Sequence, residues 1–305
     1  VGASGKESTI VITDKEWDDL YFEVQNYEQE TGNVSNNSPT SSIAYDINVK
    51  LTKVTHSHPM LSLEKTKDPD IIRKWIGSDL TVVMAKMDGL TCSISYDSNG
   101  KLIKAETRGN GIIGEDILEN ALTINSIPKQ IKFGPLTLDG EVICKYDDFE
   151  EFSDVYKNPR NFAAGSINLG DSNECANRKL TFVAWDIIDD KYDSFIDKLN
   201  ILSDLGFIVV PYKETNLNNL ETQQQDLRDL CVKLNYPIDG LVYRIIDQDT
   251  WLSKGKTDHH FCGSFAFKFY DEQYETKLTN ITWSMGKTGV LTPVANFEPV
   301  EIDGT

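Results

Sequence analysis

Residues 80–89 of the chain read LTVVMAKMDG, and this stretch decides the fold more than any other. Its apolar part, Leu80–Ala85, predicts a buried strand, and Lys86 stands at the end of that strand. A charged amine at the mouth of a buried strand costs free energy unless another group pairs with it or the protein uses it. The tetrapeptide Lys86–Gly89 alone is weak evidence, because Lys-x-Asp-Gly occurs by chance in many proteins. The stretch therefore predicts a strand with a lysine of chemical importance.

Length and composition limit the class of protein. With 305 residues, of which 39% are hydrophobic, the chain can form one large and one small domain around a sizeable core. No apolar run approaches the ~20 residues that cross a bilayer, and no signal peptide precedes residue 10, so we expect no membrane association. Five dispersed cysteines without a C-x-x-C pair argue against structural zinc and predict reduced thiols in the cytoplasm.

The net charge of −18 argues against tight nucleic-acid binding by the chain as a whole, since phosphate contacts need nearby Lys and Arg. A local basic cleft for one nucleotide remains compatible with this charge. The histidines come as His56-x-His58 and His259-His260, without a third ligand at metal spacing. We expect them to be surface or packing histidines, and we predict no protein-built metal site.

Residues 10–30 predict a separate helix at the front of the chain. Thr13 is the candidate N-cap, and Glu16 three residues later completes a capping box. Apolar side chains then recur at helical spacing: Trp17, Leu20, Tyr21, Val24 and Tyr27. Residues 31–42 are rich in Asn, Ser, Gly and Thr and predict a linker. We therefore expect a small helical subdomain and linker over residues 1–42.

From residue 50 onward the pattern is mostly short strands. The clearest signal is Ser98-Asn99-Gly100, a hairpin turn between the strands Thr91–Tyr96 and Leu102–Thr107. Further strands are predicted at Leu136–Val142, Leu180–Ile188, Phe207–Val210, Ile238–Ile246, Phe265–Phe269 and Lys277–Ser284. Helices are predicted at residues 195–205, ending at Gly206, and at residues 216–234. The expected class is α+β, with antiparallel sheets and flanking helices.

Six further segments accompany Lys86–Gly89. They read Thr107-Arg108-Gly109-Asn110-Gly111, Asp139-Gly140-Glu141-Val142, Asn158-Pro159-Arg160-Asn161-Phe162-Ala163-Ala164-Gly165-Ser166, Asp239-Gly240-Leu241-Val242-Tyr243-Arg244, Phe267-Lys268-Phe269 and Gly286-Lys287-Thr288-Gly289-Val290-Leu291-Thr292-Pro293-Val294-Ala295. In this order, from about residue 14 to about residue 299, the chain resembles the adenylation region of the NAD-dependent DNA ligase family. The runs Asn158–Ser166 and Thr288–Ala295 are highly specific to that family. The resemblance implies a nucleotidyltransferase fold of the ATP-grasp-like ligase type.

The resemblance also implies a reaction. Lys86 would attack the α-phosphate of NAD, form a ligase–AMP intermediate and release nicotinamide mononucleotide (NMN); AMP would then pass to the 5′-phosphate of a DNA nick. A lysine amine must lose its proton before it can attack, and a nearby cation and partial burial favour that loss. Lys268 and Arg244 are the candidates for that cation and for neutralising the phosphates. The plainer interpretation of Lys268 is a strand-edge charge that alternation directs into solvent.

Other residues would bind the nucleotide. Glu141 would accept hydrogen bonds from the ribose, Arg108 would contact the nucleotide, and Trp185 would stack on adenine. Their plainer interpretations are an exposed strand-end carboxylate, a surface ion pair with Glu115 or Asp116, and a core tryptophan. The resemblance places six more positions at the nucleotide or in the loop after Lys86: Ser62, Leu63, Met84, Asp88, Gly89 and Arg160.

In the front helix, Asp14, Trp17 and Asp18 match the positions with which the family holds the NMN half of NAD. Trp17 stands where the family has tyrosine, and its ring could still stack on the pyridinium. The plainer interpretation is an ordinary amphipathic helix with Trp17 in its apolar face.

Three positions depart from the family pattern. Met84 stands where a glutamate usually contacts adenine, Arg244 stands where lysine is usual, and Asn168 stands where a basic residue is expected. We expect an adenylation domain over residues 43–290 and an exit segment over residues 291–305, leading to an OB domain outside this chain. Such a chain would be a monomer that binds NAD or AMP with Mg²⁺ at the phosphates. It would meet nicked duplex DNA through other domains and seal nicks poorly.

Two other functions compete with this hypothesis. One is an ATP- or GTP-using nucleotidyltransferase of the same superfamily, which shares the Lys-x-Asp-Gly arrangement. The other is a nucleotide-binding module that has lost catalysis, because Met84, Arg244 and Asn168 are changes that such a loss could leave. The nucleotide that labels Lys86, or the absence of labelling, distinguishes the three.

Overall fold

The computed structural model describes residue 31 and residues 51–189, 191–257, 260–269, 276–285 and 291–299. The chain divides into two units, Val1–Val49 and Lys50–Thr305. The predicted front helix and linker lie outside the described residues except for Thr31, which is helical. The structural description below therefore concerns the second unit.

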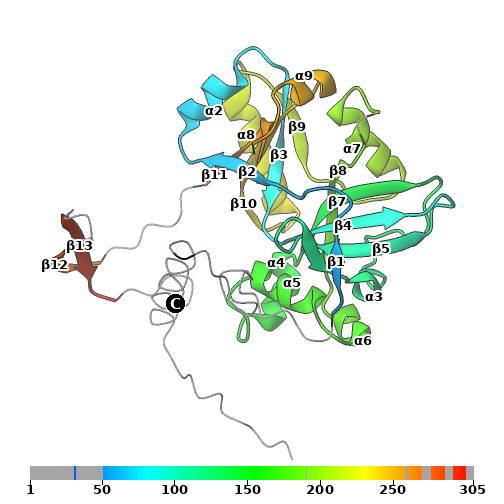
Figure 1. Ribbon diagram of the computed structural model, residues 1–305, viewed down its shortest axis with the longest axis horizontal. Coiled ribbons are helices and arrows are strands. Elements are labelled where there is room, and N and C mark those ends of the chain that lie inside the picture. The colour runs from blue at the N-terminus through cyan, green and yellow to red at the C-terminus, as the bar shows by residue number, and fades with distance from the viewer. Residues whose placement is uncertain are drawn as a thin grey trace, which may run out of the picture. The chain divides into compact units, whose positions relative to one another are not determined.

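The stretch around Lys86 lies inside a five-stranded sheet (Figure 1). Its strands, in spatial order, are β2 (Ser62–Thr66), β11 (His260–Lys268), β10 (Ile238–Ile245), β3 (Thr81–Met87) and β9 (Tyr212–Thr215). All neighbours run antiparallel except β2 and β11, which are parallel. The strand predicted at Leu80–Ala85 is confirmed as β3, and it extends two residues further, so that Lys86 lies within the strand.

A second sheet has four antiparallel strands. They are β5 (Leu102–Thr107), β4 (Leu90–Tyr96), β7 (Leu136–Ile143) and β8 (Thr181–Ile187). The hairpin predicted from Ser98-Asn99-Gly100 joins β4 to β5, and Gly100 has the positive φ of 78° that the turn requires. Two short strands, β1 (Lys53–Thr55) and β6 (Ile113–Glu115), form a separate antiparallel pair.

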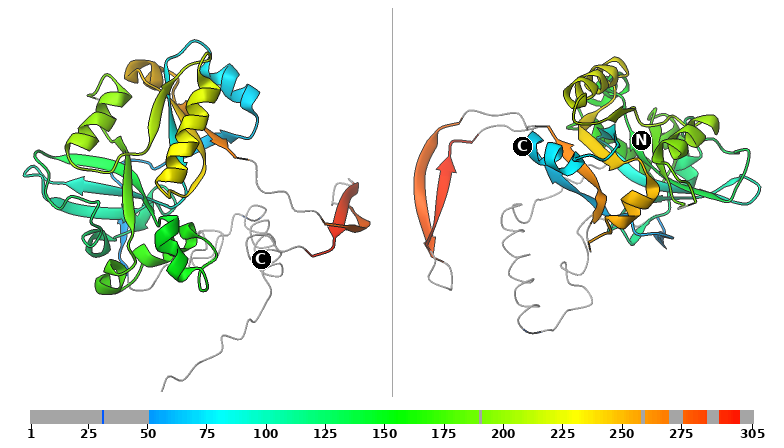
Figure 2. Two further views of the ribbon diagram at one scale, coloured as in Figure 1. Left: turned by 180° about the vertical axis from the view of Figure 1, so that it is seen from behind. Right: turned by 90° about the horizontal axis from the view of Figure 1, so that it is seen from above.

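Helices accompany both sheets (Figure 2). They are α2 (Pro69–Ile76), α3 (Leu118–Ala121), α4 (Tyr146–Phe149), the 3-10 helix η1 (Glu150–Phe152), α5 (Pro159–Ile167), α6 (Ser172–Ala176), α7 (Phe195–Asp204), α8 (Leu220–Lys233) and α9 (Gln248–Ser253). The predicted helices at 195–205 and 216–234 are confirmed as α7 and α8, and Gly206 follows α7 with φ of 92°. The mixture of helices and mainly antiparallel sheets confirms the α+β class.

Two apolar cores follow from the alternation of side chains along β3. Val82 and Met84 join the larger core, which includes side chains from β4, β7 and β8. Val83 joins the smaller core, where the five-stranded sheet packs against α2 and α8. Because β3 is covered on both faces, it reads as a continuous apolar run rather than as an alternating strand.

The strand predicted at Phe207–Val210 is wrong. Only Val209 forms an isolated parallel bridge, to Ala184, and the strand β9 starts after Pro211. Pro211 has no N–H, but its carbonyl accepts a hydrogen bond from Ala85 N at 2.9 Å. The segment therefore contacts β8 and then passes to β3. Its apolar run belongs to a connection between the two sheets rather than to one strand.

The predicted start of α8 is early by four residues, because Asn216–Asn219 form a turn instead of helix. The Asn219 side chain accepts from Asn216 N at 2.8 Å, which satisfies the backbone without a helical bond. Helices α2 and α5 were not predicted, although each starts with a capping side chain followed by proline, Asp68 and Asn158 respectively.

Strands β12 (Leu278–Met285) and β13 (Leu291–Phe297) form an antiparallel hairpin. Trp283 pairs with Pro293 and Ile281 with Ala295, whereas the alternate pairs Asn280–Asn296 and Thr282–Val294 are more polar. The hairpin thus has one apolar face, and the side chains of Ile281 and Trp283 are exposed.

All five cysteines are free thiols. Cys262 is half-buried, and the other four are buried: Cys92, Cys144, Cys175 and Cys231. In the part of the chain that the structure describes, no helix has the length and apolarity needed to cross a membrane.

Candidate functional site

Lys86 meets Lys268 at a shared carboxylate. Lys86 Nζ lies 2.8 Å from Asp239 Oδ1 and 3.1 Å from Oδ2, and Lys268 Nζ lies 3.2 Å from Oδ2 of the same side chain. The pairing of β10 with both neighbours explains this meeting, since Gly240 is the partner of Lys86 on β3 and of Lys268 on β11. The two amines therefore flank one glycine on one face of the sheet.

Asp239 reaches the amines because β10 is irregular at this point. Ile238 pairs with Met87 and Gly240 with Lys86, so Asp239 is the extra residue of a bulge. A Cβ on Gly240 would lie 2.3 Å from the carbonyl oxygen of Phe267, so only glycine fits between the strands.

The plainer interpretation placed Lys268 on the face opposite to its aromatic neighbours and in solvent, and only the first part agrees with the structure. Phe265 and Phe267 do point to the opposite face, where they join the smaller core. The face to which Lys268 points is not open solvent, because Asp239 and Lys86 occupy it, and about one third of the Lys268 side chain is exposed.

The loop after Lys86 is held by α5. Arg160, near the start of that helix, donates to Asp88 Oδ1 at 3.1 Å. Asn158 caps the helix by accepting from Asn161 N at 2.8 Å, and Pro159 follows as its first residue. At Gly89 an added Cβ would lie 2.2 Å from the carbonyl oxygen of Val142, so the turn needs glycine to approach β7.

Glu141 lies inside β7 and is half-buried, not an exposed strand-end carboxylate. Burial raises its pKa to about 7, against the opposing effects of a hydrogen bond from Thr91 and of the positive charges of Lys86 and Arg160. The two cations therefore lie within electrostatic reach of Glu141, and the nearby Asp88 adds to the rise of the pKa.

Arg108 makes no surface ion pair with Glu115 or Asp116 in the described structure. It donates instead to the carbonyl oxygen of Met60 at 3.0 Å and to Ser62 Oγ at 2.8 Å. The structure thus brings two of the predicted site residues, Arg108 and Ser62, into direct contact. Leu63, the next residue, is half-buried against the larger core.

Met84 and Trp185 lie on different sheets. Met84 is buried beside its β10 partner Val242. Trp185 is half-buried against the larger core and is the extra residue of a bulge in β8, because Asp139 pairs with Asp186 and Gly140 with Ala184. Its packing against the larger core agrees with the interpretation of Trp185 as a core tryptophan, although the side chain is only half-buried.

The expected contact of Arg244 with the Lys86 site is not found. Arg244 is buried, and its Nη1 lies 2.6 Å from Asp186 Oδ2. Its guanidinium carbon lies 4.1 Å from the ring centroid of Phe195 and 4.3 Å from that of Trp251. Arg244 pairs with Val82, four residues before Lys86 on β3. A planar guanidinium suits this slot between two rings, and its position removes Arg244 from the lysine pair.

Four polar residues of this region had no role predicted from the sequence: Asp239, Asp186, His58 and Asp139. Asp239 stood inside a quoted motif, and its position directly before a glycine on a strand was the available signal. The pairing of Asp186 with Arg244 is evident only once β8 and β10 are placed, because Arg244 is distant in sequence. Asp14, Trp17 and Asp18 lie outside the described residues.

The described residues contain no group of three or more His, Cys, Asp or Glu side chains that could hold a metal ion. The carboxylate nearest to Lys86, that of Asp239, is engaged by two lysines. The side chains present therefore do not fit a protein-built Mg²⁺ cage.

Comparison with known proteins gives two adjoining family matches. Residues 48–272 match the NAD-dependent DNA ligase adenylation domain, and residues 275–305 match the NAD-dependent DNA ligase OB-fold domain. The two matches thus meet between residues 272 and 275, ahead of β12.

Curated relatives agree with these matches. DNA ligase of Ruminiclostridium cellulolyticum is 38% identical over 98% of this chain and 47% of its own length. DNA ligase of Lachnoclostridium phytofermentans is 36% identical over 98% of this chain and 48% of its own length. That of Mycoplasmopsis agalactiae is 34% identical over 96% of this chain and 47% of its own length. The chain therefore spans about half the length of these relatives, and it belongs to the NAD-dependent DNA ligase adenylation domain family.

Proposed function

We propose that this chain transfers AMP from NAD to its own Lys86. The observation that carries the proposal is the lysine pair: Lys86 and Lys268 flank Gly240 and share the carboxylate of Asp239. One amine is then placed to attack phosphorus while a second positive charge stabilises the developing negative charge on the phosphate.

In this reaction Lys86 Nζ forms a bond to the α-phosphorus of the AMP half. The bond between that phosphorus and the bridging oxygen breaks, and NMN leaves with the bonding electrons. The proton that the amine gives up has a nearby acceptor in Asp239, whose Oδ1 lies 2.8 Å from Nζ.

The remaining residues bind and orient the nucleotide. Glu141 accepts from the ribose hydroxyls, and Trp185 stacks on adenine. Ser62 and Leu63 on β2 and Met84 on β3 line the base. Arg108 and Arg160 contact the nucleotide, with Asp88 and Gly89 setting the loop after the nucleophile. Asp14, Trp17 and Asp18 hold the NMN half. Arg244 supports the site from its buried ion pair rather than at the phosphates.

Mg²⁺ would arrive with the phosphates of the nucleotide, since the described side chains form no cage for it. In the longer protein, AMP would pass from Lys86 to the 5′-phosphate of a nick in duplex DNA bound through further domains. We place this activity in the cytoplasm and expect the chain itself to be a monomer.

The test is intact-mass measurement after incubation with Mg²⁺ and NAD, ATP or GTP in turn. We expect one added AMP with NAD, lost in Lys86→Ala and kept in Lys254→Ala, which removes an exposed lysine paired with Asp79. Labelling by ATP or GTP alone would identify the superfamily alternative. No adduct from any nucleotide would identify a module without catalysis, and the proposal would be wrong.

A further inference from the structure

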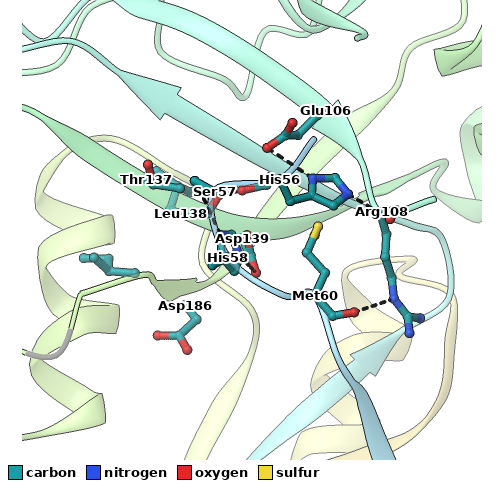
Figure 3. Close-up of polar contacts among 12 residues, drawn as sticks. His56, Ser57, His58, Met60, Glu106, Arg108, Thr137, Leu138, Asp139 and Asp186 are labelled. Carbon is teal, nitrogen blue, oxygen red and sulfur yellow. Dashed lines mark hydrogen bonds and ion pairs between the residues drawn. The ribbon is translucent and has the colours of Figure 1, made fainter. Parts of the chain in front are cut away.

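The segment between β1 and β2, residues 56–61, is fixed to the four-stranded sheet by a set of polar contacts that the proposed reaction does not use (Figure 3). We refer to this segment as the strap. It enters from the β1–β6 pair and leads directly into β2, whose first residue is Ser62. The strap therefore connects Ser62 and Leu63, whose strand β2 pairs with β11, to the four-stranded sheet.

Both ends of the strap are anchored to β5 and the turn that follows it. His56 Nδ1 lies 3.2 Å from Glu106 Oε1, and His56 Nε2 lies 2.9 Å from the carbonyl oxygen of Arg108. Met60 N donates to the carbonyl oxygen of Gly111 at 3.0 Å, and the Met60 carbonyl accepts from Arg108 Nε. These contacts hold the strap to the element that carries Arg108.

The middle of the strap is anchored to β7 by His58. Its Nε2 lies 3.0 Å from Asp139 Oδ2, and the side chains are 15% and 4% exposed. Asp139 stands two residues before Glu141 on the same strand, hence on the same face of β7. The histidine–carboxylate pair thus connects the Arg108 and Ser62 side of the site to the strand that carries Glu141.

Charged groups from several elements surround this pair, and Figure 3 shows His58 and Asp139 between Glu106 and Asp186. Burial would lower the pKa of His58, but the hydrogen bond and charge of Asp139, with the charges of Glu106 and Asp186, raise it overall. Burial raises the pKa of Asp139, against hydrogen bonds from His58 and Ser93. Lys198 on α7 and Arg244 on β10 compensate Asp186, and Lys104 accompanies Glu106.

We propose that His58 and Asp139 are positioning residues, which hold the strap against β7 and so set the spacing between the Ser62–Arg108 and Glu141 sides of the nucleotide site. This inference rests on the proposed function. The pair touches none of the reacting atoms, so its effect falls on nucleotide binding rather than on the attack by Lys86. A loosened strap weakens ground-state and transition-state binding alike, which raises KM without lowering the rate at saturation.

The direction of the pH effect follows from the raised pKa of His58. The ionic form of the pair needs ionised Asp139 and protonated His58, so it is lost as the pH rises through the raised pKa of folded His58. The wild-type KM for NAD should therefore rise over that interval. Glu141 also titrates near this range, but it is present in every variant below, so the difference between variants isolates His58.

The experiment measures self-adenylylation at varied NAD concentration. For His58→Ala we expect KM to rise about tenfold, with the rate at saturation within about twofold of wild type. His58→Gln keeps a neutral donor toward Asp139, so it should recover most of the affinity and lose the His58 part of the pH dependence. A KM unchanged in His58→Ala, or a loss confined to the rate at saturation, would overturn the proposal.

The matched control is Gln224→Ala. Gln224 bonds to the Tyr243 hydroxyl, and Tyr243 belongs to the smaller core on the opposite face of β10 from Arg244. This variant loses a half-buried hydrogen bond without touching the strap, so its KM should stay at the wild-type value. An equal rise of KM in Gln224→Ala would mean general destabilisation and would contradict the positioning role.

Hydrogen exchange gives a readout that does not depend on labelling. The amides of residues 56–62 should exchange faster in His58→Ala than in His58→Gln or wild type, and unchanged protection would count against the strap. Failure of the proposed function is separately visible, because wild type would then form no adduct with NAD whatever the strap does.

Discussion

At the scale of single residues, the carboxylate of Asp239 contacts both lysine amines of the site. Its carboxylate accepts hydrogen bonds from Lys86 and lies within ion-pair distance of Lys268. The groups are partly buried, so their mutual attraction is screened less than at an open surface. One carboxylate thus holds two amines close together, and in the proposed reaction both would lie near the same phosphate.

Glu141 supports a prediction about the balance between stability and binding. Its pKa in the folded chain is about 7, above the usual 4.5, so its ionisation is harder in the fold than in the unfolded chain. The contribution of protonated Glu141 to the free energy of unfolding is therefore complete below about pH 4.5. It disappears as the pH rises through about 7. Relative to wild type, Glu141→Gln should be more stable at pH 8 by about 1–2 kcal/mol, with the gap closing toward pH 5.

Urea unfolding of the two proteins at pH 5, 6, 7 and 8 measures this difference. If Glu141 contacts the ribose as proposed, Glu141→Gln should also bind nucleotide less well, because an amide replaces a full carboxylate. A stability difference that stays constant from pH 5 to pH 8 would show that Glu141 does not titrate in this interval.

At the scale of elements, two bulges arrange the polar side chains. The bulge in β10 presents Asp239 to the lysines, and the bulge in β8 separates Trp185 from Asp186. A bulge interrupts the simple alternation of side chains between the two faces of a strand. Neighbouring side chains can then contact different groups. In β8 this lets Trp185 pack at the larger core while Asp186 reaches across to Arg244 on the other sheet.

The pair between Asp186 and Arg244 predicts a strong stability effect. Asp186 compensates two buried cations, Arg244 and Lys198, with contacts of 2.6 and 3.3 Å. Asp186→Ala leaves both without their carboxylate and should cost about 3–5 kcal/mol. The double variant Asp186→Ala with Arg244→Met should cost less than Asp186→Ala alone, since one stranded charge is then removed.

The measurement is the free energy of unfolding from urea titrations, with Lys179→Ala as control. Lys179 forms an exposed pair with Glu151, and its loss should cost less than about 0.5 kcal/mol. If Asp186→Ala cost no more than this control, the ion pair would not be a structural link between the sheets.

Local signals in the sequence predicted the elements that local chemistry determines. The turn Ser98-Asn99-Gly100 specified its hairpin, and the apolar run before Lys86 specified β3. Pairing between distant segments has no such signal, and the parallel ladder of β2 with β11 joins residues about 200 positions apart. The location of Arg244 depends on the bulge in β8 and on two rings from α7 and α9, so the motif that contains it could not reveal its partner.

At the scale of the whole molecule, the charge of −18 contrasts with the proposed nucleotide site. Arg108, Arg160, Lys86 and Lys268 give that site four cations, whereas the chain as a whole carries 48 acidic against 30 basic residues. Long-range attraction to a polyanion is therefore weak, and only a short anionic ligand can profit from the local cations.

This contrast predicts poor DNA binding by the isolated chain. At 0.15 M salt we expect a dissociation constant for nicked duplex no tighter than about 10⁻⁶ M, the range of non-specific binding, and correspondingly slow sealing. Fluorescence anisotropy with a labelled nicked duplex measures the affinity. Nanomolar binding, or rapid sealing by this chain alone, would contradict the prediction and indicate a DNA-contacting surface within residues 1–305.

The buried thiols can serve as chemical probes of local opening of the fold. Burial raises the pKa of Cys144 to about 12 and that of Cys231 to about 11, and it raises those of Cys92 and Cys175 as well. The thiolate is the form that attacks an alkylating reagent, so these four sulfurs do not react until their surroundings open. Cys92 lies on β4, Cys175 on α6 and Cys231 on α8. The order in which these thiols react therefore shows which of these elements opens first in the native protein.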